Sequence, residues 1–318
     1  MPRLFFLALL AALALARPSS TYVGRMGVGV DANWATFRWE IQAFDEQIPR
    51  DFRAMGFTHV RIRAKGIGAP DKAYLDHLER VVRASLAAGL FPVLAYSGGA
   101  LNENPGEQAI QDAVRWWQAV AARFAGYPEA LAFDLFIEPA KKINDHPEVL
   151  LAYYRRALSA IRPLHPRRVV FLAPRYTAKP DYLPELEPLF SKDPYTAAES
   201  HFYAAGPSKT RPNKRWTTGT PKEKALVLGY VERIVAWREK TGVPVWQGAW
   251  MPGNYNKGND YSVPEQVRFA AFMACALKKA GIPYAVNADH KFYDPKKKAW
   301  IPEMLPVVRA VVHPSCGP

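Results

Sequence analysis

Residues 74–96, YLDHLERVVRASLAAGLFPVLAY, decide the fold that we expect for this chain. Apolar side chains in Tyr74–Ala88 recur at spacings of three and four, which predicts an amphipathic helix. Gly89 follows, and glycine readily adopts the left-handed conformation that ends many helices. Phe91–Tyr96 is then an apolar run of the kind found in strands buried on both faces of a sheet. The segment therefore predicts a helix that leads directly into a buried strand.

The same junction recurs along the chain, with Gly56, Gly242 and Gly281 between a helical stretch and an apolar run. Alternating strands and helices favour a parallel sheet covered by helices, and eight such units favour a closed α/β (β/α)8 TIM barrel over an open sheet. The first strand lacks a following Gly-rich phosphate loop, which argues against a dinucleotide-binding fold. The expected strands are Gly27–Asn33, His59–Ala64, Phe91–Tyr96, Leu131–Glu138, Arg168–Leu172, Ala197–Tyr203, Pro244–Trp250 and Tyr284–Ala288. The clearest expected helices are Tyr74–Ala88, Gln108–Phe124, Glu148–Ile161, Lys222–Lys240 and Val263–Ala280.

The chain of 318 residues is 49% apolar and 22% charged, which suits one large folded domain. It begins with Met1-Pro2-Arg3 and an apolar run from Leu4 to Ala16 that ends in a small-x-small pattern. These features are typical of a secretory signal peptide, and a retained membrane anchor is the alternative. We therefore expect residues 1–16 to be a signal peptide and residues 17–318 to form a single-domain barrel. The mature protein is expected to be secreted or periplasmic, without stable membrane insertion.

The chain contains two cysteines, Cys275 and Cys316. An oxidising compartment permits a disulfide between them. Cys275 lies in an apolar helical stretch, however, and there a buried free thiol is the expected state. Metal-ligand spacings are absent from the sequence, so we expect no metal and no other cofactor.

The formal net charge is +13, which could serve a nucleic acid, an anionic membrane or an acidic polysaccharide as partner. Lysine and arginine are scattered over helices and loops, and the densest run, Lys296–Lys298, lies beside a turn. The sequence has no nucleic-acid-binding motif, so no nucleic-acid partner is expected. An acidic glycan stays open as a substrate.

Polar and aromatic residues stand at the ends of the expected strands. In a barrel these ends form the face that carries the reactive groups. The two longest strand-to-helix loops, residues 204–219 and 254–261, lie on the same face and contribute Trp216 and Asn254. Aromatic rings with hydrogen-bonding neighbours suit sugars, which offer apolar ring faces and hydroxyl groups. The candidates for binding a poly- or oligosaccharide are Asp31, Asn33, Arg61, Tyr96, Trp216, Trp250, Asn254 and Asn287.

Several of these segments resemble the motifs of family 5 glycoside hydrolases. Phe133–Pro139, FDLFIEP, resembles the fourth-strand signature in which Asn-Glu-Pro carries the general acid/base. Phe57–Ile62 resembles the second-strand motif whose arginine supports the nucleophile, and Ser200–Tyr203 is similar to the sixth-strand His-x-Tyr. Pro244–Trp250 stands where the family has Gly-Glu-Phe or Gly-Glu-Trp, and Tyr293-Asp294-Pro295 with Trp300 resembles the usual family ending. The resemblance implies a secreted hydrolase of β-glycan O-glycosyl bonds with Glu138 as its general acid/base.

Three positions depart from the family pattern. Ile137 replaces the asparagine before the acid/base, Tyr96 stands near the third-strand histidine position, and Ala249 occupies the nucleophile position. A retaining mechanism needs a second carboxylate about 5–5.5 Å from the first, which alanine cannot supply. Since Ile137 and Ala249 depart together, natural divergence explains them better than a designed replacement of one glutamate. Another carboxylate could then activate water at the inverting spacing of about 6.5–9.5 Å, with Asp289, Asp31 and Asp260 as candidates.

Catalysis is expected to centre on Glu138 as a general acid whose pKa is raised by burial. His201, Tyr203 and Asp289 are the further catalytic candidates. His201 also has a structural interpretation as a core histidine, and Asp289 has one as a turn residue. Arg61 can equally form a structural ion pair, and Trp216 and Trp250 can belong to the core.

Two alternatives from other functional classes stay open. The double departure at Ile137 and Ala249 favours a barrel that binds glycans without cleaving them. The positive charge favours a lyase for acidic polysaccharides. In that lyase Arg61, Arg63 and Lys65 would neutralise a uronate carboxylate while Tyr203 or His201 abstracts the neighbouring proton.

Overall fold

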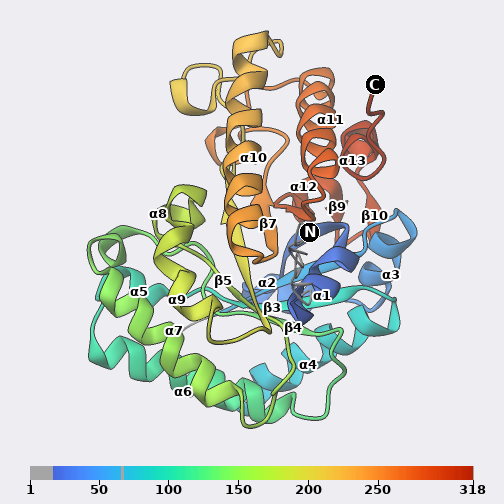
Figure 1. The fold of residues 1–318 in the computed structure, drawn as a ribbon. Coiled ribbons are helices and arrows are strands. Elements are labelled where there is room, and N and C mark those ends of the chain that lie inside the picture. Colours follow the sequence, from blue (N-terminus) through green and yellow to red (C-terminus); the bar gives the residue numbers. More distant parts are fainter. Residues whose placement is uncertain (1–16, 66–67, 318) are drawn as a thin grey trace, which may run out of the picture.

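Eight parallel strands close into a barrel in sequence order, as the computed structural model shows for residues 17–65 and 68–317 (Figure 1). β1 pairs with both β2 and β8, which completes the ring. The predicted (β/α)8 barrel is therefore confirmed. The strands are β1 Val28–Ala35, β2 His59–Ala64, β3 Phe91–Tyr96, β4 Ala132–Asp134, β5 Val170–Leu172, β6 Thr196–His201, β7 Val245–Trp250 and β8 Tyr284–Val286.

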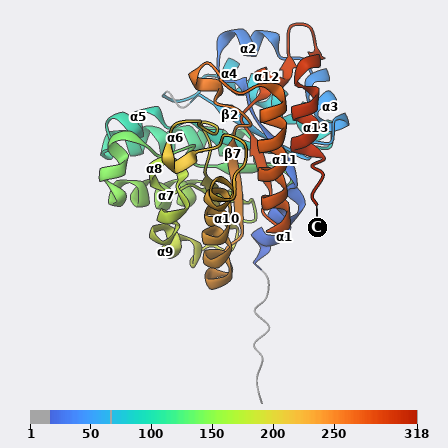
Figure 2. The same ribbon diagram turned by 90° about the horizontal axis from the view of Figure 1, so that it is seen from above.

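Helices surround the barrel, with α5 to α7 on one side and α11 and α13 on the other (Figure 2). The five helices expected from apolar spacing are present, with ends within two residues of those predicted. The helices are α1 Pro18–Met26, α2 Arg38–Ala43, α3 Gln47–Ala54, α4 Lys72–Ala87, α5 Gly99–Glu103, α6 Glu107–Arg123, α7 Pro147–Ile161, α8 Arg175–Ala178, α9 Glu187–Phe190, α10 Pro221–Thr241, α11 Val263–Lys279, α12 Asp289–Phe292 and α13 Leu305–Val312. Short 3-10 turns are η1 Lys141–Asp145, η2 Pro180–Leu186, η3 Pro212–Lys214, η4 Tyr255–Lys257 and η5 Pro302–Met304, and β9 Tyr293–Asp294 pairs with β10 Ala299–Trp300.

β4 ends earlier than the predicted Leu131–Glu138 strand. The Asp134 carboxylate accepts a hydrogen bond of 3.3 Å from the Phe136 amide, so this amide does not bond to a neighbouring strand. Leu135 and Ile137 still donate backbone hydrogen bonds to Phe171 of β5 and Tyr96 of β3, so the regular ladder is interrupted at Phe136 before the chain leaves the sheet. Glu138 lies in the connection beyond β4, with a positive φ of 53°.

Helix α1 covers the end of the barrel at which the strands begin. Its Tyr22, Val23 and Met26 form a buried cluster with interior side chains such as Phe171 and Trp246. The Tyr22 hydroxyl donates a hydrogen bond of 3.0 Å to the Ala130 carbonyl, just before β4. The opposite end of the barrel, at which the strands end, is thus the one available for a substrate.

A disulfide joins Cys275 of α11 to Cys316 in the C-terminal tail, with a Cα–Cα distance of 5.4 Å. The expectation of a free buried thiol at Cys275 is therefore wrong. The sequence pattern indicated the apolar helix correctly. It did not indicate that α13 packs against α11 and returns the tail to the side of this helix.

We expect the double variant Cys275→Ser/Cys316→Ser to lose about 3–4 kcal/mol of stability, because the bond closes a loop between residues 41 positions apart. Chemical denaturation of the oxidised wild type and of the variant measures the difference. The variant should not respond to added reductant, whereas the wild type should become less stable. Equal unfolding midpoints for oxidised and reduced wild type would contradict this expectation.

The predicted signal peptide, residues 1–16, lies outside the described residues. In the part of the chain that the structure describes, no helix combines the length and apolar character needed to cross a membrane. α10, with 21 residues, includes Lys, Arg and Glu throughout.

Candidate active site

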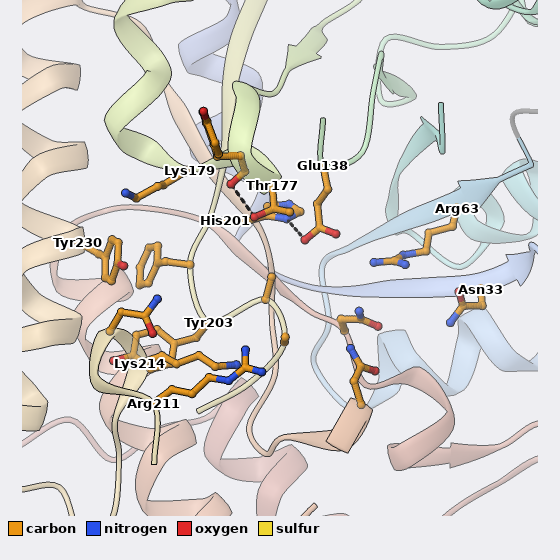
Figure 3. A pocket seen from close by; sticks show the side chains of 17 residues that line it. Asn33, Arg63, Glu138, Thr177, Lys179, His201, Tyr203, Arg211, Lys214 and Tyr230 are labelled. Carbon is orange, nitrogen blue, oxygen red and sulfur yellow. Dashed lines mark hydrogen bonds and ion pairs between the residues drawn. The ribbon is translucent and has the colours of Figure 1, made fainter. Parts of the chain in front are cut away.

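A cavity of about 690 Å³ opens where the barrel strands end (Figure 3). The loops after β6 and β7 line part of it, through residues such as Arg211, Lys214 and Asn256. The prediction that these two loops lie over the barrel mouth is therefore confirmed. Of the site residues named from the sequence, those that line this cavity are Asn33, Arg63, Glu138, His201, Tyr203 and Asn287.

Glu138 points into the cavity with 30% of its side chain exposed. Among the described residues that line the cavity, it is the one carboxylate. Its Oε1 lies 2.8 Å from His201 Nδ1. Glu138, Thr177 and Tyr203 all combine a position on the cavity wall with a positive φ, of 53°, 60° and 55°. Such backbone strain in residues other than glycine gathers at functional sites, because the surrounding fold must maintain it.

His201 is held between two carboxylates, since its Nε2 lies 2.6 Å from Glu199 Oε1. A ring nitrogen that faces a carboxylate is favoured as a donor, so the two contacts together favour the doubly protonated imidazolium. Burial lowers the pKa of His201, but the charge of Glu199 and the hydrogen bonds to Glu138 and Glu199 raise it above its ordinary value. The side chain of His201 has no exposed surface, so the substrate meets Glu138 rather than the imidazole.

The pKa of Glu138 is lowered, although the sequence analysis expected it to be raised. Burial on its own raises the pKa of this carboxyl group. The hydrogen bond and the positive charge of His201, with Arg63 and Arg61 behind them, outweigh burial. Both shifts favour an ion pair in which the Glu138 carboxylate is charged and the His201 imidazole holds the exchangeable proton.

Beneath this pair, Arg61 forms the centre of a fully buried ionic cluster. Its Nε and Nη2 donate hydrogen bonds of 2.9 and 2.8 Å to Asp31, and its Nη1 donates to Glu199. Asp134 lies 3.4 Å from the same Nη1. Arg61 and Arg63 hold the pKa of Asp31 well below its usual range, whereas burial and the Glu199 carboxylate raise that of Asp134 well above it.

Arg61 and Asp31 were predicted to bind substrate, and the structure corrects both assignments. Neither side chain has exposed surface, and neither lines the cavity. They form the structural ion pair that the sequence analysis kept as the alternative for Arg61. Asp31 is also unavailable as a second catalytic carboxylate, because Arg61 and Arg63 occupy both of its oxygens.

Tyr96, Trp216 and Trp250 were predicted as sugar platforms and are instead buried between the barrel and its helices. Tyr96 packs against Trp116 of α6, at 4.9 Å between ring centroids. Trp216 and Trp250 both contact Phe269 of α11, at 5.0 and 6.0 Å. A ring without an exposed face cannot stack on a sugar, so the core interpretation holds for all three.

Asp289, Asn254 and Asp260 lie outside the cavity lining. Asp289 accepts hydrogen bonds of 2.8 and 3.2 Å from the backbone and side-chain amides of Asn33 and so orients that residue. Asn254 and Asp260 bond to each other in the loop after β7. Tyr203 contributes its ring to the cavity, while its hydroxyl is buried and has no hydrogen-bond partner in the described structure.

Four cations line the same cavity as Glu138: Arg63, Lys179, Arg211 and Lys214. Arg63 and Lys179 form ion pairs with Asp31 and Asp181. Arg211 and Lys214 have no ion-pair partner among the described residues. Burial and the neighbouring charges of Arg211 and Lys257 lower the pKa of Lys214, so an anion in the cavity would relieve this repulsion.

The chain is similar to known polysaccharide-degrading enzymes in sequence. The family model described as "Cellulase (glycosyl hydrolase family 5)" matches residues 26–287. Endoglucanase H of Acetivibrio thermocellus is 24% identical over 280 residues, which are 84% of this chain but only 30% of that protein.

Solved structures share the fold at low sequence identity. An endoglucanase superposes with a TM-score of 0.78 at 20% identity, covering 93% of this chain and 99% of its own. Thermotoga maritima Cel5A, solved in complex with cellobiose, gives a TM-score of 0.78 at 18% identity, with coverages of 92% and 99%. The cellulose synthase subunit Z (CcsZ) of Clostridioides difficile gives 0.77 at 17%, with coverages of 91% and 100%. Because the family model spans most of the described barrel, the chain belongs to glycosyl hydrolase family 5, a family of polysaccharide-active glycoside hydrolases.

Proposed function

We propose that this protein hydrolyses glycosidic bonds in an acidic polysaccharide, with Glu138 as the general acid. The observation that carries the proposal is the position of Glu138, whose carboxylate lies next to His201 and faces a cavity that four cations also line. General acid catalysis requires a proton donor within hydrogen-bond reach of the leaving oxygen. Glu138 meets this requirement for a sugar bound in the cavity.

His201 supplies the proton that Glu138 passes on. The proton on His201 Nδ1 moves over 2.8 Å to Glu138, and from there to the glycosidic oxygen as the bond to the anomeric carbon breaks. The leaving sugar departs as an alcohol. Water adds to the anomeric carbon and loses its own proton to solvent, and a second proton from solvent then recharges the pair.

A covalent intermediate has no part in this route. Ala249 supplies no nucleophile, and Asp31, Asp289 and Asp260 are engaged elsewhere. Direct attack by water on the face opposite the leaving group inverts the anomeric configuration. The proposal therefore predicts an inverting enzyme in a family whose resemblance implies a retaining mechanism.

The substrate assignment follows from the charge of the cavity. Arg63 of β2 and the pair Arg211 and Lys214 in the loop after β6 line the cavity into which a substrate would bind. Carboxylate or sulfate groups on successive sugars would pair with these cations, which a neutral glucan cannot do.

Incubation with matched neutral and acidic polysaccharides tests the proposal. New reducing ends are expected from the acidic set, and NMR of the first product should show inversion. Release of products from neutral glucans alone would contradict the substrate class. Binding to every glycan without any product would contradict catalysis and favour the binding protein considered above.

The double variant Arg211→Gln/Lys214→Gln should raise KM for an acidic substrate about tenfold, since each lost partly solvated ion pair costs roughly 0.5–1 kcal/mol. The value of kcat should change little, because neither side chain touches the proton route. Lys296→Gln/Lys297→Gln removes the same charge from an exposed turn outside the cavity and serves as the matched control. An equal rise in KM for both double variants would show that net charge, rather than the cavity, attracts the substrate.

The second candidate function is that of a lyase, which cleaves a uronate polymer by elimination. The ion pair with His201 favours the ionised form of Glu138, which can act as a base. In this route Glu138 removes the proton next to a uronate carboxylate that Arg63 neutralises. The electron pair left on that carbon forms the new double bond, the bond between the neighbouring ring carbon and the glycosidic oxygen breaks, and the departing oxygen takes the proton from Glu138 and leaves as an alcohol. His201 and Tyr203, the bases expected from sequence, have no exposed nitrogen or hydroxyl to reach the substrate. Ultraviolet absorbance of an unsaturated product separates elimination from hydrolysis.

We also propose that the protein acts outside the cytoplasm. The disulfide between Cys275 and Cys316 supports this location, because such bonds persist in oxidising compartments. Mass spectrometry of the protein recovered from culture medium or periplasm should find the chain starting at or close to Arg17. Recovery of the full chain from the cytoplasm would contradict the assignment.

A further inference from the structure

The buried carboxylate of Glu199 is a group that neither the sequence analysis nor the family comparison assigns. It lies on β6, two residues before His201, so both side chains point into the barrel. Its Oε1 accepts from Arg61 Nη1 and lies 2.6 Å from His201 Nε2. Glu199 thus connects the buried cluster around Arg61 to the residue that exchanges its proton with Glu138.

The neighbouring strand is shaped around this carboxylate. A Cβ atom added to Gly248 of β7 would lie 2.1 Å from Glu199 Oε1 and 2.6 Å from His201 Nε2. Gly248 directly precedes Ala249, the position at which the family resemblance implies a glutamate. In this chain one of the carboxylates that Arg61 contacts comes from β6, and β7 leaves room for it.

The charges around His201 determine what Glu199 does. Arg61 Nη1 lies 3.2 Å from His201 Nε2 and disfavours its protonation, whereas the closer Glu199 carboxylate favours it. Asp134 faces Glu199 but makes no contact with His201. The charged and titratable groups that interact with Glu199 or His201 are Glu138, Arg61, Asp134 and Tyr154.

We propose that Glu199 is a positioning residue that keeps His201 protonated and thereby stores the proton that Glu138 delivers. The role of the stored proton in catalysis rests on the proposed function, while the protonation of His201 does not. Glu199 has no exposed surface and does not touch the substrate. It acts only through His201. It sets the pH above which the Glu138–His201 pair no longer holds the exchangeable proton.

Titration of the histidine rings by NMR tests the proposal without any assay of activity. The chain has seven histidines, and the signals of His201 are assigned by their loss in His201→Gln. In the wild type, His201 should stay protonated above pH 6.5, the ordinary histidine value. A neutral His201 at that pH overturns the proposal, whatever any variant does.

Glu199→Gln keeps the shape of the side chain and removes its charge. We expect the pKa of His201 to fall by roughly one to two units, the usual effect of one close opposite charge. Asp134→Asn is the matched control, because it removes a carboxyl group from the same cluster without a contact to His201. It should leave the pKa of His201 close to the wild-type value, and an equal fall in both variants overturns the assignment to Glu199.

Should Glu199→Gln fail to fold, Gly248→Ala displaces the carboxylate and keeps every charge, and it should lower the same pKa. The activity profile is the second readout. The alkaline limb of kcat/KM should move to lower pH in Glu199→Gln by the same amount as the His201 titration. If the His201 titration shifts in Glu199→Gln but the wild type shows no enzymatic activity, the proposed hydrolase function is refuted and the effect of Glu199 on His201 stands. If the His201 titration does not shift, only the role proposed for Glu199 is refuted.

Discussion

The variant Glu138→Gln should lose about 10²–10⁴-fold in kcat on an acidic polysaccharide, the usual contribution of a general acid. Glutamine has the same shape and still reaches His201 Nδ1, but it carries no proton that a glycosidic oxygen can take. The substitution leaves the positively charged side chains that are proposed to bind the substrate unchanged, so KM should change little. Initial rates of reducing-end formation measure the loss.

Asp289→Asn is the informative comparison for Glu138→Gln. Asp289 was a catalytic candidate in the sequence, and in the structure it binds Asn33 and does not line the cavity. We expect its replacement to reduce kcat much less than Glu138→Gln does. A comparable loss would mean that Asp289 acts as a second catalytic carboxylate, and the water-only route would then be wrong.

The variant Arg61→Met should lower the free energy of unfolding by about 3–5 kcal/mol, the usual cost of removing one partner from a buried ion pair. Methionine fills the space but leaves the carboxylates of Asp31 and Glu199 buried without their shared cation. Chemical denaturation at neutral pH measures the change, with the free energy extrapolated to water.

Arg63→Met provides the control for this loss. Arg63 pairs with Asp31 alone and has 23% of its side chain exposed, so its removal should cost clearly less stability. Arg61→Met with wild-type stability would contradict the central role of Arg61 in the cluster. The pKa of Asp31 is depressed, so the stability this pairing contributes is present at neutral pH and is lost as acid protonates the carboxylate.

The barrel could be predicted because its signals are local. A helix with apolar spacing, a terminating glycine and a buried apolar run fit within about twenty residues, and this unit repeats. Segments such as Tyr74–Tyr96 therefore identify both the elements and their parallel order. Strand ends were less accurate, since at β4 the side chain of Asp134 accepts from the Phe136 amide and interrupts the regular ladder.

The candidate site could be predicted only in part, because a strand end does not reveal on which side of the barrel wall a side chain lies. His201 faces the interior, whereas Tyr96 and Trp250 face the helices. A register irregularity between Gln247 and Trp250 also breaks the simple alternation along β7. The assignments of Tyr96 and Trp250 failed for this reason.

Other parts of the site depend on contacts between distant segments. Lys179, Arg211 and Lys214 converge from loops after two different strands, and neither spacing nor composition relates them. Glu199 could have been found, because its separation of two residues from His201 places both side chains on the same face of one strand. Glu199 is absent from the candidates named above because it lies just outside the Ser200–Tyr203 motif.

Helix α1, which covers the end of the barrel at which the strands begin, also determines how the protein would be oriented if its N-terminal side were attached to a support. Tyr22, Val23 and Met26 fix the start of the described chain at the end of the barrel opposite the cavity. A bead, an electrode or a cell surface attached on that side would leave the entrance turned toward the medium. Long polymer substrates could then approach without meeting the support.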